Sequence, residues 1–162
     1  MYGSHGRLLL VDLGSRTTDI EPIPDIVRQR LLGGVGLASY LLYRFCPIGI
    51  DPLSPENPLI FTSSPFIGTG ITTASKITIA TKSPQTGMIG DSLSSSYLAL
   101  ALKRTGFDAL VITGRAAEPS VLVIDDDRVR YIPAGHRLGL DPAATSDAVR
   151  AELGKGFRVA AI

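Results

Sequence analysis

The side chains that most often carry catalysis are scarce in this sequence. Histidine occurs at His5 and His136 only, and the single cysteine is Cys46. None of the three stands in a Cys-x-x-Cys or i, i+4 spacing, so they do not predict a metal site. One cysteine cannot hold an iron–sulfur cluster, which needs about four thiolates. Gly-x-Ser-x-Gly and Gly-Lys-Ser/Thr motifs are absent, which disfavours a serine hydrolase and a P-loop ATPase.

Loops rich in small polar residues are the remaining candidates for a binding site. Between Asp51 and Gly87, two short apolar strands lead into loops of Gly, Ser, Thr and Pro, whose backbone N–H and hydroxyl groups suit phosphates. Lys76 follows such a loop directly and adds an ammonium group. The run 92–96 contains four serines and opens a predicted helix, whose N-terminus attracts anions. Each pattern alone is more typical of a solvated strand end or a simple helix cap.

Two further patterns resemble ligand sites but favour ordinary turns. The glycines of Gly33–Gly36 follow a predicted helix rather than a strand, so they do not match a dinucleotide fingerprint and predict a turn between two helices. The acidic run Asp125–Asp127 lacks the glycine and the distal glutamate of a calcium loop. We expect it to be a solvated hairpin turn.

Composition predicts a globular domain without a general charge-driven partner. The 162 residues are 44% hydrophobic and 19% charged, with a net charge of +1, which predicts no nucleic acid and no membrane among the partners. The N-terminus has neither a signal-peptide pattern nor a membrane-length apolar run. With one cysteine, these features predict a cytoplasmic protein.

Hydrophobic periodicity and turn residues predict alternating strands and short helices. The expected strands are 7–13, 17–23, 59–62, 76–81, 88–93, 109–113, 120–124, 129–132 and 157–162, and the expected helices are 25–32, 37–45, 97–104 and 142–153. The last strand is an apolar run without a polar end, so we expect the domain to be incomplete at its C-terminal end.

Several short motifs occur in the order found in one enzyme family. They are Met1–Gly3 with Gly6-Arg7, Gly33–Ala38 with Tyr40–Leu42, Asp51–Asn57, Thr81–Pro84 with Thr86-Gly87, and Lys103 with Gly106–Ala109. In these residues, and over the whole chain, the sequence resembles the N-terminal domain of the tungsten-containing aldehyde ferredoxin oxidoreductases.

The resemblance implies a fold and an activity. The fold is α+β, a β-rich N-terminal domain with two sheets and short helices, in which residues 1–162 are an incomplete metallopterin-binding domain without the cluster-bearing domains. The family's enzymes oxidise aldehydes to carboxylic acids at a tungsten (or molybdenum) bis-pyranopterin centre. Electrons then pass through a 4Fe-4S cluster, ligated outside this chain, to ferredoxin. The implied partners are C-terminal domains or a second subunit, a ferredoxin-type acceptor and a small aldehyde. A homodimer, in which a second copy of the chain is the partner, is a further option.

The resemblance also implies a cofactor-binding site of two segments. Where the family often has Gly-Gly-Arg, this chain has Ala74, Ser75 and Lys76; where the family has Asn-Ser-Gly-Gly, it has Leu93, Ser94, Ser95 and Ser96. Lys76 keeps the positive charge but lacks the two-pronged guanidinium that grips phosphate. These departures indicate a divergent branch.

Two other functions are compatible with the same residues. A non-catalytic, β-rich interaction module would use the same surface without a cofactor and would close its sheet at Ile162. A nucleotide-binding domain would need phosphate contacts at Gly33–Gly36.

Overall fold

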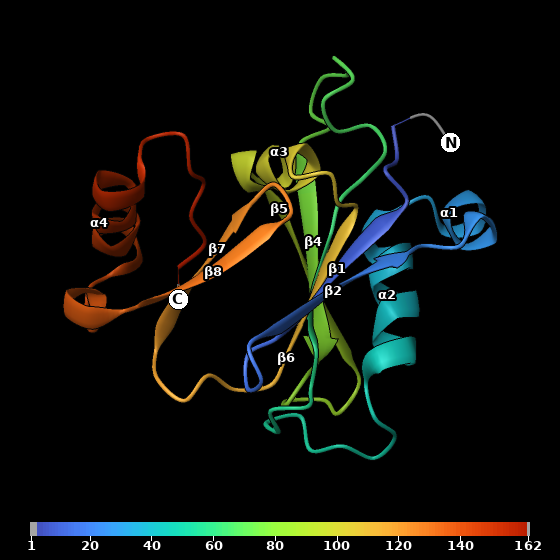
Figure 1. The fold of residues 1–162 in the computed structure, drawn as a ribbon. Coiled ribbons are helices and arrows are strands. Elements are labelled where there is room, and N and C mark those ends of the chain that lie inside the picture. The colour runs from blue at the N-terminus through green and yellow to red at the C-terminus, as the bar shows by residue number, and fades with distance from the viewer. Residues whose placement is uncertain (1–2, 162) are drawn as a thin grey trace. The chain divides into compact units, whose positions relative to one another are not determined.

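The protein folds into two compact units that divide between Ala116 and Ala117. The computed structural model describes residues 3–161. Its mixture of sheets and short helices confirms the predicted α+β class (Figure 1). Among residues 3–161, every helix is too short or too polar to cross a lipid bilayer.

The first unit is built on a six-stranded sheet with the strand order β2-β1-β6-β3-β4-β5. The strands are β1 (Arg7–Asp12), β2 (Thr17–Pro22), β3 (Leu59–Thr62), β4 (Lys76–Lys82), β5 (Ile89–Ser95) and β6 (Ala109–Thr113). Only β1 and β6 pair in parallel, and the other neighbours are antiparallel. The two edges of the sheet are therefore β2 and β5.

Three helices accompany this sheet: α1 (Asp25–Leu31), α2 (Gly34–Phe45) and α3 (Tyr97–Arg104). Helix α2 lies along the sheet and packs on β3 and β4 (Figure 1). Because strand side chains alternate between faces, Ile60 and Val111 join Leu37 and Leu41 of α2 in one buried core. Helix α3 connects β5 to β6.

The second unit contains the two-stranded sheet of β7 (Ser120–Asp125) and β8 (Arg128–Pro133), the 3₁₀ turn η1 (Gly135–Arg137) and helix α4 (Pro142–Leu153). The predicted hairpin and helix are confirmed here. Arg137 is 7% exposed and ties this unit together. It forms an ion pair with Glu152 of α4 and donates to the carbonyls of Pro133 and Ala134.

Two predicted element boundaries were wrong by two residues or more, because tertiary contacts extend the elements. Helix α2 begins at Gly34 rather than at Leu37, since the Gly34 N–H donates to Ser63 O and Gly34 O accepts from Thr62 Oγ1. Strand β5 continues to Ser95 rather than ending at Leu93, since it pairs with β4 along its full length.

The predicted strand 157–162 was also wrong over its described part. Residues 157–161 form no strand, and Phe157 N instead donates to Gly154 O in a turn after α4. Apolar composition alone cannot form a strand without a partner that supplies hydrogen bonds. Ile162 lies outside the described residues.

Candidate functional site

The two predicted site segments meet at one end of the six-stranded sheet, where β4 begins and β5 ends. Ser96 N donates to Ser75 O at 3.1 Å, and Ser75 Oγ donates to Ser96 O at 3.0 Å. In the strand register, Lys76 stands opposite Ser95. The structure thus brings together two segments that are about twenty positions apart in the sequence, and these are the segments in which the resemblance implies a cofactor site.

The serine hydroxyls at this junction divide into two kinds. Ser75 Oγ is engaged with Ser96 O, and Ser96 Oγ accepts from Leu98 N as the N-cap of α3. These two serines therefore build the junction. Ser94 and Ser95 are exposed, and their hydroxyls form no hydrogen bond with any residue in the described range 3–161. They are the hydroxyls that remain available to a ligand.

Lys76 provides the positive charge of the junction. Its side chain is exposed, and it takes part in no ion pair or hydrogen bond with a side chain of residues 3–161. The only carboxylate on β5, Asp91, stands opposite Ala80. That position is four residues along β4, a strand distance of roughly 13 Å. The Lys76 ammonium is consequently not neutralised from the neighbouring strand.

The strand register assigns the predicted residues to opposite faces of the sheet. Directly opposed residues of an antiparallel pair project to the same face, so Ser95 shares the face of Lys76, whereas Ser94 shares the face of buried Ile77. Leu93, opposite Thr78, lies on the Lys76 face and is 59% exposed. Because the predicted strand ends at residue 93, the sequence did not reveal this division.

Asp108 anchors this end of the sheet. In the sequence it is part of the motif Gly106–Ala109 and is not among the predicted site residues. Its Oδ1 accepts from Lys103 Nζ at 2.5 Å, and its Oδ2 accepts from Ser4 Oγ and Gly6 N, both at 2.6 Å. Its backbone carbonyl accepts from Ser63 N at 2.9 Å and Ser63 Oγ at 3.1 Å. Lys103 is only five positions away, but Ser4, Gly6 and Ser63 are 45 or more positions away, so no local signal in the sequence reveals the whole network.

Electrostatics at Asp108 follow from its burial and its donors. The side chains of Asp108 and Lys103 are 7% and 9% exposed. Burial by itself raises the pKa of Asp108. The hydrogen bonds from Lys103 and Ser4, together with the Lys103 charge and the Gly6 N–H, outweigh it and hold the pKa below its ordinary value. Asp108 is therefore a carboxylate in the folded protein.

The motif residues at the opposite end of β4 have an architectural role. Asn57 Nδ2 donates to Pro52 O at 2.7 Å and to Lys82 O at 3.0 Å, and Asn57 Oδ1 accepts from Lys82 N at 3.2 Å. Lys82 Nζ donates to Ile50 O at 2.5 Å. The two motifs Asp51–Asn57 and Thr81–Pro84 thus clamp the loop before β3 to the end of β4.

The histidines, the cysteine and the acidic turn do not assemble into a metal centre. No group of three or more His, Cys, Asp or Glu side chains in the part of the chain that the structure describes could hold a metal ion. Cys46 caps the C-terminal end of α2 and packs against the α2 core. Asp126 lies in the exposed turn between β7 and β8, as the sequence predicted.

Comparison with known proteins gives one family. The family described as aldehyde ferredoxin oxidoreductase, N-terminal domain, matches residues 8–162. The tungsten-containing aldehyde ferredoxin oxidoreductase of Thermococcus kodakarensis is 38% identical over 154 residues, which is 95% of this chain and 26% of that protein. The Pyrococcus furiosus protein of the same name is 36% identical over the same shares. The chain spans about a quarter of the length of these curated relatives.

A more distant relative and a solved structure agree with this result. The aliphatic sulfonate oxidoreductase, WOR-like subunit, of Pyrococcus furiosus is 35% identical over 86% of this chain and 23% of that protein. A chain of the active-site complex BamBC of benzoyl coenzyme A reductase, solved with 1,5-dienoyl-CoA, superposes with a TM-score of 0.89 at 30% identity. The superposition covers 94% of this chain and 23% of the BamBC chain. The chain therefore belongs to the aldehyde ferredoxin oxidoreductase family, in which it corresponds to the N-terminal domain.

Proposed function

We propose that this chain is the cofactor-binding part of an oxidoreductase that oxidises aldehydes to carboxylic acids at a tungsten (or molybdenum) bis-pterin centre. Membership of the family supports the reaction class. The observation that carries the proposal is the hydrogen-bonded Ser75–Ser96 junction, because it sets an unneutralised Lys76 beside Ser95 at the end of the sheet.

The residues of the junction fit the phosphate of a pterin cofactor. A phosphate needs positive charge and several hydrogen-bond donors. Lys76 Nζ supplies the charge, and the exposed hydroxyl of Ser95 on the same face supplies a donor that has no partner in residues 3–161. The hydroxyl of Ser94 is also exposed but lies on the opposite face. The proposed binding segments are Ala74, Ser75 and Lys76 with Leu93, Ser94, Ser95 and Ser96. The glycine-free segment 93–96 would bind chiefly through side chains.

This chain's contribution would be to bind and orient the cofactor. When bound, the metallopterin supplies two-electron oxidation, and the protein supplies positioning and electrostatics. Lys76 would neutralise a phosphate on the face that it shares with Ser95. Both proposed contacts belong to β4 and β5, whose pairing holds them in register.

The proposed function requires components outside this chain. We propose that a 4Fe-4S cluster is ligated in further domains or a second subunit, and that it passes electrons to a ferredoxin-type acceptor in the cytoplasm. Since the described residues contain no cluster ligand set, the chain by itself would bind the pterin without turning over an aldehyde.

The test measures metal and pterin in the complete polypeptide that contains this domain. We expect Lys76→Ala combined with Ser94→Ala to lose most of its pterin, and Lys76→Ala combined with Ser95→Ala to lose more, because Ser95 shares the Lys76 face. Each lost charge-assisted contact corresponds to about tenfold in affinity or more. Tyr43→Ala is the matched control, because Tyr43 is 90% exposed on α2. Full pterin occupancy in both double variants would exclude the assignment.

A further inference from the structure

We infer that Asp108 is a positioning residue for the Ser75–Ser96 junction, because it holds the far ends of the two segments that meet there. The inference rests on the proposed function only where it concerns cofactor binding. The role of Asp108 in holding the two segments concerns this chain alone.

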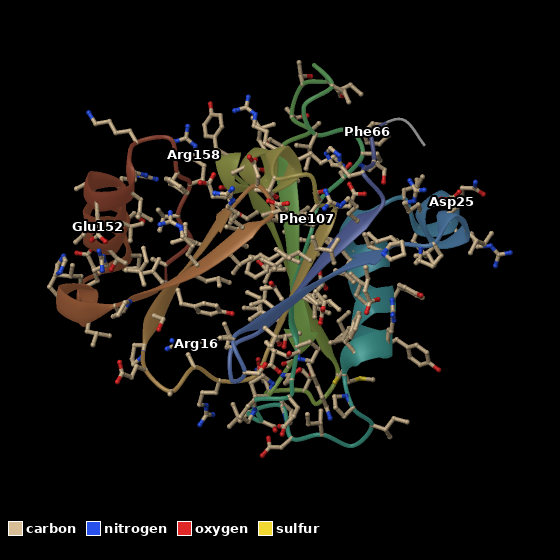
Figure 2. The ribbon with its side chains drawn as sticks, in the orientation of Figure 1. Arg16, Asp25, Phe66, Phe107, Glu152 and Arg158 are labelled. Carbon is tan, nitrogen blue, oxygen red and sulfur yellow. The ribbon has the colours of Figure 1, made fainter. Side chains whose placement is uncertain are left out.

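Asp108 joins separate segments through all of its polar atoms. Its carboxylate binds Lys103 of α3 and the N-terminal residues Ser4 and Gly6. Its carbonyl binds Ser63 at the end of β3, and its N–H donates to Arg7 O at 2.9 Å. The preceding residue, Phe107, is fully buried, and Figure 2 shows its ring in the interior of the drawn side chains. The buried Phe107 therefore fixes the backbone next to Asp108 in the core.

Two segments run from Asp108 to the junction. The β3–β4 loop (residues 63–75) begins at Ser63, which is bound to Asp108, and ends at Ser75, which is bound to Ser96. Helix α3 begins at its cap Ser96 and ends next to Lys103, which is bound to Asp108. The loop and the helix are therefore each tied at both ends and form a closed frame.

The start of the loop is also held by Ile67, which is 4% exposed, whereas residues 68–73 are all exposed and depend on the two tied ends. Phe66 and Ile71 are 52% and 57% exposed, and Figure 2 shows Phe66 at the periphery of the molecule. The loop lies against α3, since a Cβ on Gly68 would come within 3.6 Å of Leu100 Cδ1. A shift of α3 therefore reaches the loop and with it Ser75.

Asp108 acts at a distance from the proposed ligand. Six residues of α3 (97–102) lie between Ser96 and Lys103, so the cap and the ion pair are about 10 Å apart along the helix. Asp108 is also 5% exposed, with its carboxylate fully engaged. It can affect a ligand at the junction only by fixing the frame.

The first experiment is amide hydrogen exchange on the 162-residue chain. We expect Asp108→Asn and Lys103→Met to accelerate exchange in residues 63–75 and 97–104 by about tenfold or more relative to β1 and β6. Lys103→Arg should restore much of the protection lost in Lys103→Met, because it restores the charge-assisted bond. Asn57→Ala is the matched control: it removes a partly buried clamp at the other end of β4 and should leave both segments protected.

A milder variant covers the case in which Asp108→Asn does not fold. Ser63→Ala removes only the hydroxyl bond to Asp108 O and should accelerate exchange in residues 63–75 more than in α3. Uniform acceleration across the whole sheet in Ser63→Ala and Lys103→Met would overturn the inference, since it would show a general stability role.

The second experiment separates this inference from the proposed function. It measures pterin in the complete polypeptide for Lys103→Met, Lys103→Arg and the Lys76→Ala, Ser95→Ala double variant. Pterin lost in Lys103→Met and regained in Lys103→Arg supports the positioning role. Pterin retained in Lys103→Met but lost in the double variant overturns the positioning role and leaves the proposed function intact. Pterin retained in the double variant rejects the proposed function, whereas the exchange result still decides whether the frame exists.

Discussion

Lys103 Nζ lies 2.5 Å from Asp108 Oδ1, and both side chains are less than one-tenth exposed. A buried ion pair of this kind costs desolvation energy and is weak support for net stability, but the loss of one partner leaves an uncompensated buried charge. The main effect of the pair is therefore to fix one arrangement of α3 relative to β6.

Acid should weaken the contribution of Asp108 to stability. Its pKa in the folded protein is below the ordinary value of 3.8, because the donors from Lys103 and Ser4 outweigh burial. A depressed folded pKa gives stability that is complete above the unfolded pKa and is lost as the pH falls through the folded pKa. Urea unfolding of the wild-type chain and Asp108→Asn between pH 7 and pH 2 should therefore show a free-energy difference that is constant above about pH 5 and shrinks below pH 4. A difference independent of pH across this range would contradict the assignment.

Gly33→Ala should destabilise the first unit strongly. Gly33 has φ +148°, and a Cβ there would lie 2.5 Å from Ser63 O, closer than atoms can approach. We expect a loss of about 3 kcal/mol or more in the free energy of unfolding, since backbone strain and a clash with the β3–β4 loop add. Gly49→Ala is the control: Gly49 has φ +74°, but nothing lies within 4 Å of its added Cβ, so about 1 kcal/mol is expected. Equal losses in thermal or urea unfolding would show that the contact with Ser63 is unimportant.

Asn57→Ala should release the loop before β3 from the end of β4. It removes two donated bonds and leaves the Lys82 N–H without its side-chain acceptor, at a cost of about 2 to 3 kcal/mol. Urea unfolding measures this cost, and amide exchange should accelerate at residues 50–58. The exposed substitution Gln29→Ala serves as the comparison. A loss below 0.5 kcal/mol for Asn57→Ala would show that the clamp carries no net stability.

The sequence alone predicted most elements of the fold and the two segments of the candidate site. Hydrophobic periodicity and turn residues predicted the strands that became β1, β2 and β4, because these signals are local. Motif order gave the family. The serine run before α3 predicted a helix cap for the same reason, because capping depends on a residue and its near neighbours, and the structure shows that Ser96 is this cap.

Only the tertiary structure decided how those segments pair and which distant residues they contact. The pairing of β5 with β4 made Ser94 and Ser95 strand residues and placed them on opposite faces, and contacts with the end of β3 drew Gly34 into α2. Asp108 gained its role from partners that lie up to 104 positions away. Such contacts leave no periodic or local pattern in a single sequence, because they form only when distant strands and loops close on one another.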